Sequence, residues 1–273
     1  MAGERLDYTA EAVEAAKSVL IELMHILGEY RDNVVLVGGW IPGLLLPQSQ
    51  DSHVGSIDVD LALNHRRLTE IGYRAIGEIL RHYGYTQDEQ QPFIFRKEVR
   101  GQTVKVDFLA GEYGGTGKDR RTQKILDMRP RKARGCDLAF EIPPVEIAVK
   151  GRLPDGAFDE VQVQISSVVP FLIMKGMAME DRRKAKDAYD IYFVLQNYPG
   201  GLDEVARTFD PYLKMPLVQE GLRKIAGKFA STDHVGPRDI ADFLETRNDE
   251  ERAIRQRDAY EKVNYLLRKL GIT

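Results

Sequence analysis

The chain has 273 residues, 43% of them hydrophobic, which is enough for one large domain or two modest domains with a buried core. Its formal net charge of −3 excludes a global positive field for nucleic acid, so any site for a polyanion must be local. The single cysteine, Cys136, excludes an internal disulfide framework and a cysteine-ligated zinc site. Residues 1–8 have no apolar signal-peptide core, and the uncharged run 33–50 is broken by glycine and proline, so we expect a soluble, cytoplasmic protein.

The first predicted elements lead into a glycine turn. Apolar residues at helical spacing within 9–30 predict an amphipathic helix that opens at Thr9 and stops at Gly28. The β-branched run at 34–37 predicts a strand, Gly38-Gly39 predicts a turn, and a short apolar helix is expected to open near Pro42.

A second strand carrying Ser56, Asp58 and Asp60 follows. Side chains alternate along a strand, so these three residues are expected on one face. The two carboxylates, about 7 Å apart at the rise of a strand, repel each other unless a cation lies between them. Oxygen-only ligation by aspartates suits Mg²⁺. The alternative is a solvated edge strand with two surface acids.

A helix over 67–83 and a hairpin of strands at 93–96 and 103–109 come next. The second hairpin strand holds one acid, Asp107, on the same face as Lys105. If this strand lies beside the strand of Asp58 and Asp60, Asp107 becomes a third carboxylate in the same pocket.

A glycine-rich and then basic segment extends over 112–135. It is either a mobile surface loop or the place where a polyanionic substrate docks. Its basic residues are Lys118, Arg120, Arg121, Lys124, Arg129, Arg131, Lys132 and Arg134.

Strands predicted at 140–149 and 157–165 extend the sheet, and the remainder of the chain is helical. We therefore expect a sheet-containing domain over 1–165 and a helical C-terminal domain over 166–273. After a long helix, four amphipathic helices are expected at 202–209, 216–229, 237–244 and 249–270.

The long helix is predicted to be capped by Ser166 and Ser167. At about 100° per residue, Lys175, Arg182 and Lys186 fall on one face if the helix is continuous. Lys175 lies within an apolar stretch, where a compact ammonium that reaches into a cleft toward phosphates fits better than a solvated lysine.

The glycine turn, the S-x-D-x-D pattern of Ser56, Asp58 and Asp60, and the later Asp107 resemble the polymerase-β-like nucleotidyltransferase superfamily. The block from Lys175 through Arg182 and Lys186-Asp187 to Asp190 is similar to that of the AbiEii/AbiGii toxin family. The resemblance covers roughly residues 34–192. At Trp40, a bulky residue directly after the glycines, the chain departs from the family pattern.

The resemblance implies an α/β (α+β) fold with a polymerase-β-like core of a mixed sheet and flanking helices. Asp58, Asp60 and Asp107 would bind Mg²⁺, or Mn²⁺, with Asp107 alternatively acting as general base. Lys175 would contact the phosphates of a nucleoside triphosphate and join Asp58, Asp60 and Asp107 as catalytic residues. The residues that would bind or orient the nucleotide are Gly38, Gly39, Ser56, Lys175, Asp187 and Asp190, with Lys175 and Asp190 reaching the cleft from the helical domain.

The implied activity is transfer of a nucleoside monophosphate from a nucleoside triphosphate to an acceptor, and the 3′ end of tRNA is the leading candidate for that acceptor. The resemblance also implies that the protein is the toxin of a toxin–antitoxin system and has a cognate antitoxin. Two alternatives remain. One is a nucleotidyltransferase acting on a small cationic drug, for which Glu141 and Glu146 are available. The other is a non-catalytic binding protein.

Overall fold

The computed structural model describes residues 5–112 and 130–272, which form two compact units. Of the described residues, 8–41, 55–112 and 130–167 form the sheet unit, and 5–7, 42–54 and 168–272 form the helical unit. Two N-terminal segments thus belong with the C-terminal helices, because packing rather than chain order defines a unit. Residues 113–129 of the predicted glycine-rich and basic segment lie outside the described residues.

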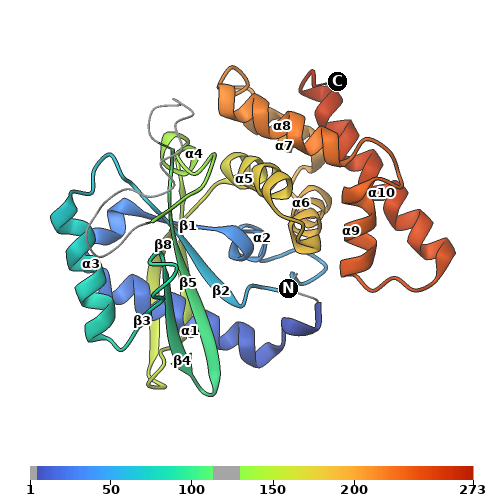
Figure 1. The fold of residues 1–273 in the computed structure, drawn as a ribbon. Helices are drawn as coiled ribbons and strands as arrows, with labels where there is room; N and C mark the ends of the chain where they lie inside the picture. Colours follow the sequence, from blue (N-terminus) through green and yellow to red (C-terminus); the bar gives the residue numbers. More distant parts are fainter. Residues whose placement is uncertain (1–4, 113–129, 273) are drawn as a thin grey trace. The chain divides into compact units, whose positions relative to one another are not determined.

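The expected mixed α/β fold is confirmed by a sheet to which the described part of the chain contributes eight strands (Figure 1). Its strands run in the order β3-β4-β5-β2-β1-β8-β7, and β6 pairs with β5 off this path. The strands are β1 (Val34–Val37), β2 (Asp58–Leu63), β3 (Thr86–Gln87), β4 (Ile94–Val99), β5 (Gln102–Ala110), β6 (Arg131–Lys132), β7 (Val145–Arg152) and β8 (Phe158–Ile165).

The sheet is mixed in direction. Strand β2 is antiparallel to β1 and parallel to β5, and β4 and β5 form the expected antiparallel hairpin. The pairing of β2 with β5 places the strand of Asp107 beside the strand of Asp58 and Asp60, which is the condition for a third acid at the same site. Because residues of paired strands at the same level share a face, this pairing decides which side chains meet.

Helix α1 (Ala10–Ile26) packs against β2, β5, β7 and β8 (Figure 1). Thr9 caps it, since its Oγ1 accepts a hydrogen bond from Ala12 N at 3.2 Å. The helix ends at Ile26, and a 3₁₀ turn, η2 (Gly28–Asn33), begins at Gly28, the predicted stop. Buried apolar residues of α1 and of β2, such as Leu20 and Leu61, belong to the core of this unit.

Two predicted limits in the sheet unit are corrected. Helix α3 (Glu70–His82) starts three residues later than predicted, because the Thr69 side chain caps it by accepting a hydrogen bond from Gly72 N. The strand predicted from residue 140 begins at Val145, after α4 (Leu138–Glu141). Pro143 and Pro144 separate the two elements, since proline has no N–H to donate to a strand ladder.

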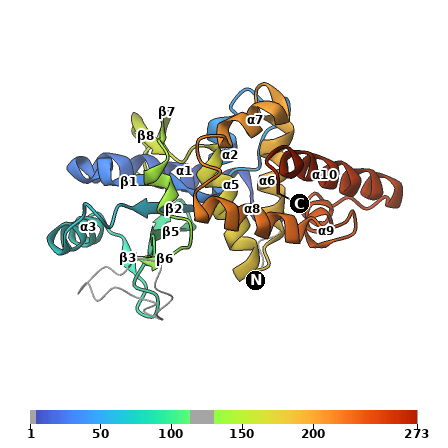
Figure 2. The same cartoon turned by 90° about the horizontal axis from the view of Figure 1, so that it is seen from above.

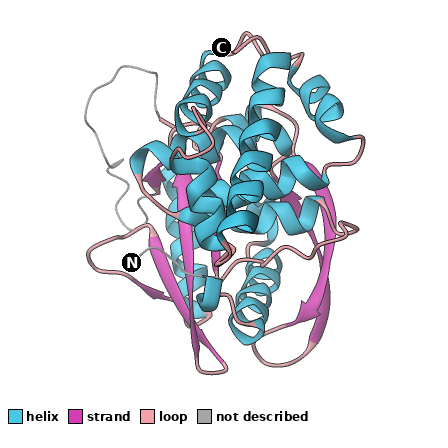
Figure 3. Cartoon of the chain, turned by 90° about the vertical axis from the view of Figure 1, so that its right-hand side faces the viewer, coloured by secondary structure: helices cyan, strands magenta, loops and turns pink. Residues whose placement is uncertain are grey.

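The described strands all belong to the sheet unit, and the helical unit consists of helices and loops (Figure 3). Within the helical unit, α5 packs against α8, and α10 packs against α9 (Figure 2). Its helices are α2 (Ile41–Leu45, from residue 42), α5 (Val168–Asp181), α6 (Ala185–Asn197), α7 (Gly201–Phe209), α8 (Pro216–Lys228), α9 (Val235–Phe243) and α10 (Asp249–Lys269), with a 3₁₀ turn η1 (Arg5–Asp7). Helices α7, α8, α9 and α10 begin and end within two residues of the four helices predicted for this part of the chain.

The predicted continuous helix after residue 166 is wrong. It is divided into α5 and α6, with Lys184 in an extended conformation between them. Arginine and lysine are good helix formers, so propensity gives no sign of the break. The hydroxyls of Ser166 and Ser167 make no hydrogen bond, so the predicted capping role is also wrong.

None of the helices described within 5–112 and 130–272 is long and apolar enough to cross a lipid bilayer.

Candidate active site

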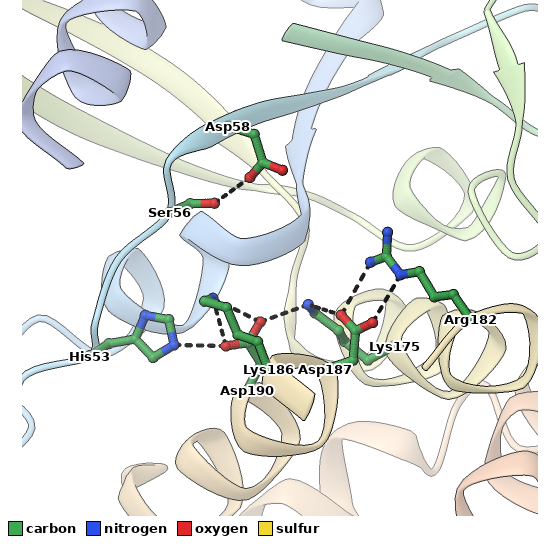
Figure 4. A network of polar contacts seen from close by, with 8 residues as sticks. All are labelled: His53, Ser56, Asp58, Lys175, Arg182, Lys186, Asp187 and Asp190. Carbon is green, nitrogen blue, oxygen red and sulfur yellow. Dashed lines mark hydrogen bonds and ion pairs between the residues drawn. The ribbon is translucent and has the colours of Figure 1, made fainter. Parts of the chain in front are cut away.

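Strand β2 presents two acids on one face of the sheet. Asp58 and Asp60 are half-buried and alternate with the fully buried Val59 and Leu61. Ser56 precedes β2 instead of lying within it, which corrects the predicted strand. Its hydroxyl nevertheless donates a hydrogen bond to Asp58 Oδ1 at 2.7 Å, so the serine fixes the orientation of the first acid (Figure 4).

A third acid lies next to this pair. In the parallel register of β2 and β5, Asp60 is opposite Asp107, and Asp58 is opposite Lys105. Paired strands are about 4.8 Å apart, so these side chains are neighbours on one face. Asp107 is 4% exposed, and its Oδ1 is buried without a hydrogen-bond partner. We call Asp58, Asp60 and Asp107 the acidic face.

The glycine turn shapes this face. It forms the 3₁₀ turn η3 (Gly38–Trp40), in which Gly38 has a φ of +78°. A Cβ on Gly38 would lie 2.2 Å from Asp60 Oδ2, so only glycine leaves room for that carboxylate. Trp40 Nε1 donates a hydrogen bond to the carbonyl oxygen of Asp58 at 2.8 Å, which ties the turn to the start of β2.

Substitution of Gly38 by alanine tests this arrangement. The new Cβ would force the Asp60 carboxylate to move, so we expect Gly38→Ala to lower at least tenfold the nucleotide transfer that the family resemblance implies. Gly101→Ala is the matched control, because Gly101 has a φ of +77° and no atom within 4 Å of an added Cβ. Both variants carry the backbone strain of about 1–2 kcal/mol, measurable by urea unfolding. Full activity in Gly38→Ala would contradict the proposed importance of the Asp60 position.

The acidic face fits a divalent cation by its donor set. Within the described residues there is no ready group of three His, Cys, Asp or Glu side chains that could hold a metal ion by itself. Mg²⁺ does not require one, because it is commonly bound by one or two carboxylates together with water and substrate phosphates. Asp58 and Asp60 meet that requirement, and the unpaired Oδ1 of Asp107 offers a further oxygen.

A second cluster of predicted site residues lies in the helical unit (Figure 4). Lys175 on α5 is 7% exposed, and its ammonium contacts Asp187 Oδ1 at 2.7 Å and Asp190 Oδ2 at 2.6 Å. Arg182 donates to Asp187 at 3.0 and 3.2 Å, and Lys186 Nζ lies 2.8 Å from Asp190 Oδ1. We call these five residues the ionic cluster; the break between α5 and α6 lets their side chains converge.

Charge pairing outweighs burial at Lys175 and Asp190 of the ionic cluster. Burial disfavours the charge of Lys175, but Asp187 and Asp190 more than compensate and raise its pKa above the ordinary value. Burial likewise opposes the charge of Asp190, but Lys175 and Lys186 hold its pKa well below the ordinary value. For Lys186 burial dominates, and its pKa is lowered although Asp190 opposes the shift.

His53 is a contributor that the sequence did not reveal. Its imidazole is 1% exposed, and Nε2 lies 2.9 Å from Asp190 Oδ1, so Nε2 is the nitrogen that donates to the carboxylate. The ring stacks on Tyr189, with centroids 5.3 Å apart. No local pattern could have indicated His53, because its partner is 137 residues away in the chain.

We expect His53 to make the protein less stable at mildly acidic pH. Burial lowers the pKa of His53 below its ordinary value of 6.5, although its hydrogen bond to Asp190 opposes the shift. Below pH 6.5 the unfolded chain therefore binds a proton that the folded chain does not, and stability falls by up to about 1.4 kcal/mol per pH unit.

The measurement is the free energy of unfolding in urea at pH 7.0 and 5.5 for the wild type and His53→Gln. Glutamine retains an N–H donor but does not titrate, so His53→Gln is expected to lose less stability over this interval. Equal losses in the two proteins would show that His53 does not titrate as its burial indicates.

Glu141 and Glu146 are the acids available to bind a cationic drug as acceptor, and each is either paired with a cation or exposed. Glu141 on α4 forms an ion pair with Arg66 at 2.9 Å, and Glu146 is exposed on the edge strand β7. Neither observation favours a site for a cationic small molecule.

A mixed sheet whose adjacent strands carry three acids beside a glycine turn has the features expected of a nucleotidyltransferase. The family model for the nucleotidyl transferase AbiEii toxin of type IV toxin–antitoxin systems matches residues 23–266. The chain belongs to this family. It is an enzyme of the nucleotidyltransferase class and the toxin of a toxin–antitoxin system, which decides against a non-catalytic binding protein. No curated protein matches the chain.

Proposed function

We propose that the protein transfers a nucleoside monophosphate from a nucleoside triphosphate to RNA in a Mg²⁺-dependent reaction, with the 3′ end of tRNA as the acceptor. The observation that carries the proposal is the register of β2 and β5, which brings Asp107 opposite Asp60. Carboxylates placed on one face of adjacent strands repel one another unless cations lie beside them, and such an arrangement is typical of a site that uses a cation.

The proposed reaction gives each residue of the acidic face a role. Asp58 and Asp60 would hold the Mg²⁺, and Ser56 fixes Asp58 through its hydrogen bond. When bound, the cation would neutralise negative charge on the phosphates. Asp107 either completes this ligand set or takes the proton of the attacking hydroxyl through its unpaired Oδ1.

The reaction is an in-line displacement at phosphorus. A hydroxyl oxygen of the acceptor forms a bond to the α-phosphorus, the bond from the α-phosphorus to the bridging oxygen breaks, and pyrophosphate leaves with the electron pair. The role that the family resemblance gives to Lys175 is a contact with the nucleotide phosphates. Asp187 and Asp190, which both contact its ammonium, would keep that lysine charged and oriented.

Basic residues beside the acidic face support RNA as the acceptor. Strand β6 carries Arg131 and Lys132 and pairs with β5, the strand of Asp107. In a chain with a formal net charge of −3, this is a local concentration of positive charge suited to phosphate contacts. We place the reaction in the cytoplasm, in which nucleoside triphosphates and tRNA are available, and expect a cognate antitoxin to oppose it.

The test is incubation of the protein with total cellular RNA, Mg²⁺ and each of the four α-labelled nucleoside triphosphates in turn. Label in tRNA-sized RNA in one lane would support the proposal and identify the base. A parallel reaction with an aminoglycoside in place of RNA provides the comparison. Label in the drug and not in RNA would overturn the choice of acceptor.

A further inference from the structure

Lys105 lies on the acidic face itself. Its position on β5 is opposite Asp58, and its ammonium lies 2.8 Å from Asp107 Oδ2. Arg131 approaches the same oxygen less closely, at 3.7 Å. Among the residues that the structure describes, the cation nearest to the buried third acid is therefore a lysine from the same strand, two residues away.

The two partners of this ion pair differ in burial. The side chain of Asp107 is 6% exposed, whereas that of Lys105 is 37% exposed. A buried carboxylate needs a partner, because its charge is costly to bury alone. A lysine ammonium on a flexible four-carbon stem, open to solvent, meets that need without being fixed in place. The other carboxylate oxygen, Oδ1, has no hydrogen-bond partner, so the site is only half satisfied by protein atoms.

We propose, on the basis of the function proposed above, that Lys105 is an exchangeable counter-ion of the acidic face. In the metal-free protein its ammonium neutralises Asp107. When a divalent cation is bound at Asp58 and Asp60, repulsion between the two positive charges moves the ammonium away from Asp107. The freed ammonium then contacts the triphosphate oxygens of the nucleotide, so that one lysine links metal occupancy to binding of the substrate.

The first test measures Mn²⁺ binding to the full-length chain by electron paramagnetic resonance. Lys105→Met removes a positive charge from the metal's surroundings, so we expect it to bind Mn²⁺ about five- to tenfold more tightly than the wild type. Lys105→Arg retains the charge and should bind Mn²⁺ like the wild type. Lys150→Met is the matched control, since Lys150 also lies on a strand and pairs with an acid, Glu160, at 3.1 Å.

The second test measures binding of inorganic tripolyphosphate by calorimetry at saturating Mn²⁺. Here Lys105→Met should bind severalfold more weakly than the wild type, opposite in sign to its effect on Mn²⁺. A lysine needed only to hold the fold would weaken both.

Unchanged or weaker Mn²⁺ binding by Lys105→Met would overturn the counter-ion role, and unchanged tripolyphosphate binding would overturn the phosphate contact. Asp58→Asn separates these failures from failure of the proposed function. If Asp58→Asn left Mn²⁺ binding intact, the metal site itself would be wrong.

Discussion

Replacement of Asp58 by asparagine is expected to lower nucleotide transfer by about a thousandfold or more, because charge stabilisation of this kind contributes several kcal/mol to catalysis. The side chain keeps its shape, and the Ser56 hydroxyl can still donate to the oxygen of the asparagine amide. Stability should therefore change little. The measurement is the initial rate of label incorporation into RNA, together with the urea midpoint of the variant.

Asp155→Asn is the control for this experiment. Asp155 is an acid of the same unit whose Oδ1 accepts a backbone hydrogen bond from Ala157, a role that asparagine can also fill. The same asparagine substitution at a position away from the acidic face should leave transfer unchanged. If Asp58→Asn retained more than a tenth of the wild-type rate, neither the metal role of Asp58 nor the proposed site would stand.

Replacement of Asp190 by asparagine is expected to destabilise the protein by about 3–5 kcal/mol, the usual cost of removing one partner from a buried ion pair. Asp190 is fully buried and contacts Lys175, Lys186 and His53. After the substitution Lys175 keeps its contact with Asp187, whereas Lys186 loses the charged carboxylate that lies 2.8 Å from its ammonium. The measurement is the free energy of unfolding in urea at pH 7.

Two further variants sharpen this result. Asp187→Asn should cost less, because Arg182 is 46% exposed and is solvated when it loses its partner, while Lys175 keeps Asp190. Adding Lys186→Met to Asp190→Asn removes a buried positive charge and should restore part of the lost stability. If the double variant were less stable than Asp190→Asn by the full cost of Lys186→Met alone, Lys186 and Asp190 would not be coupled.

The pH dependence provides an independent check. Because the pKa of Asp190 is held below its ordinary value of 3.8, the stabilisation by this group is present above that pH and is lost as the pH falls below it. The wild type and Asp190→Asn should therefore converge in stability as the medium is acidified. A constant difference between them down to pH 2 would contradict ionisation as its source.

Local sequence patterns predicted much of the acidic face. Alternation along a strand put Asp58 and Asp60 on one face of β2, and the same rule put Lys105 and Asp107 together on β5. The pattern was unreliable at Ser56, which lies before the strand, and at the long helix, which is divided between α5 and α6. Propensity and periodicity rate a segment by its residue types, so neither indicates that the strand begins after Ser56 or that the helix is divided.

The sequence by itself determined the strand acids, the glycine turn, the terminal helices and the family, because each depends on residues close together in the chain or on a pattern of residue types. Only the tertiary structure decided that Asp107 lies opposite Asp60, that Lys105 neutralises it, and that His53 bonds to Asp190 across 137 residues. Strand register and side-chain pairing between distant segments are set by packing, for which no local signal exists.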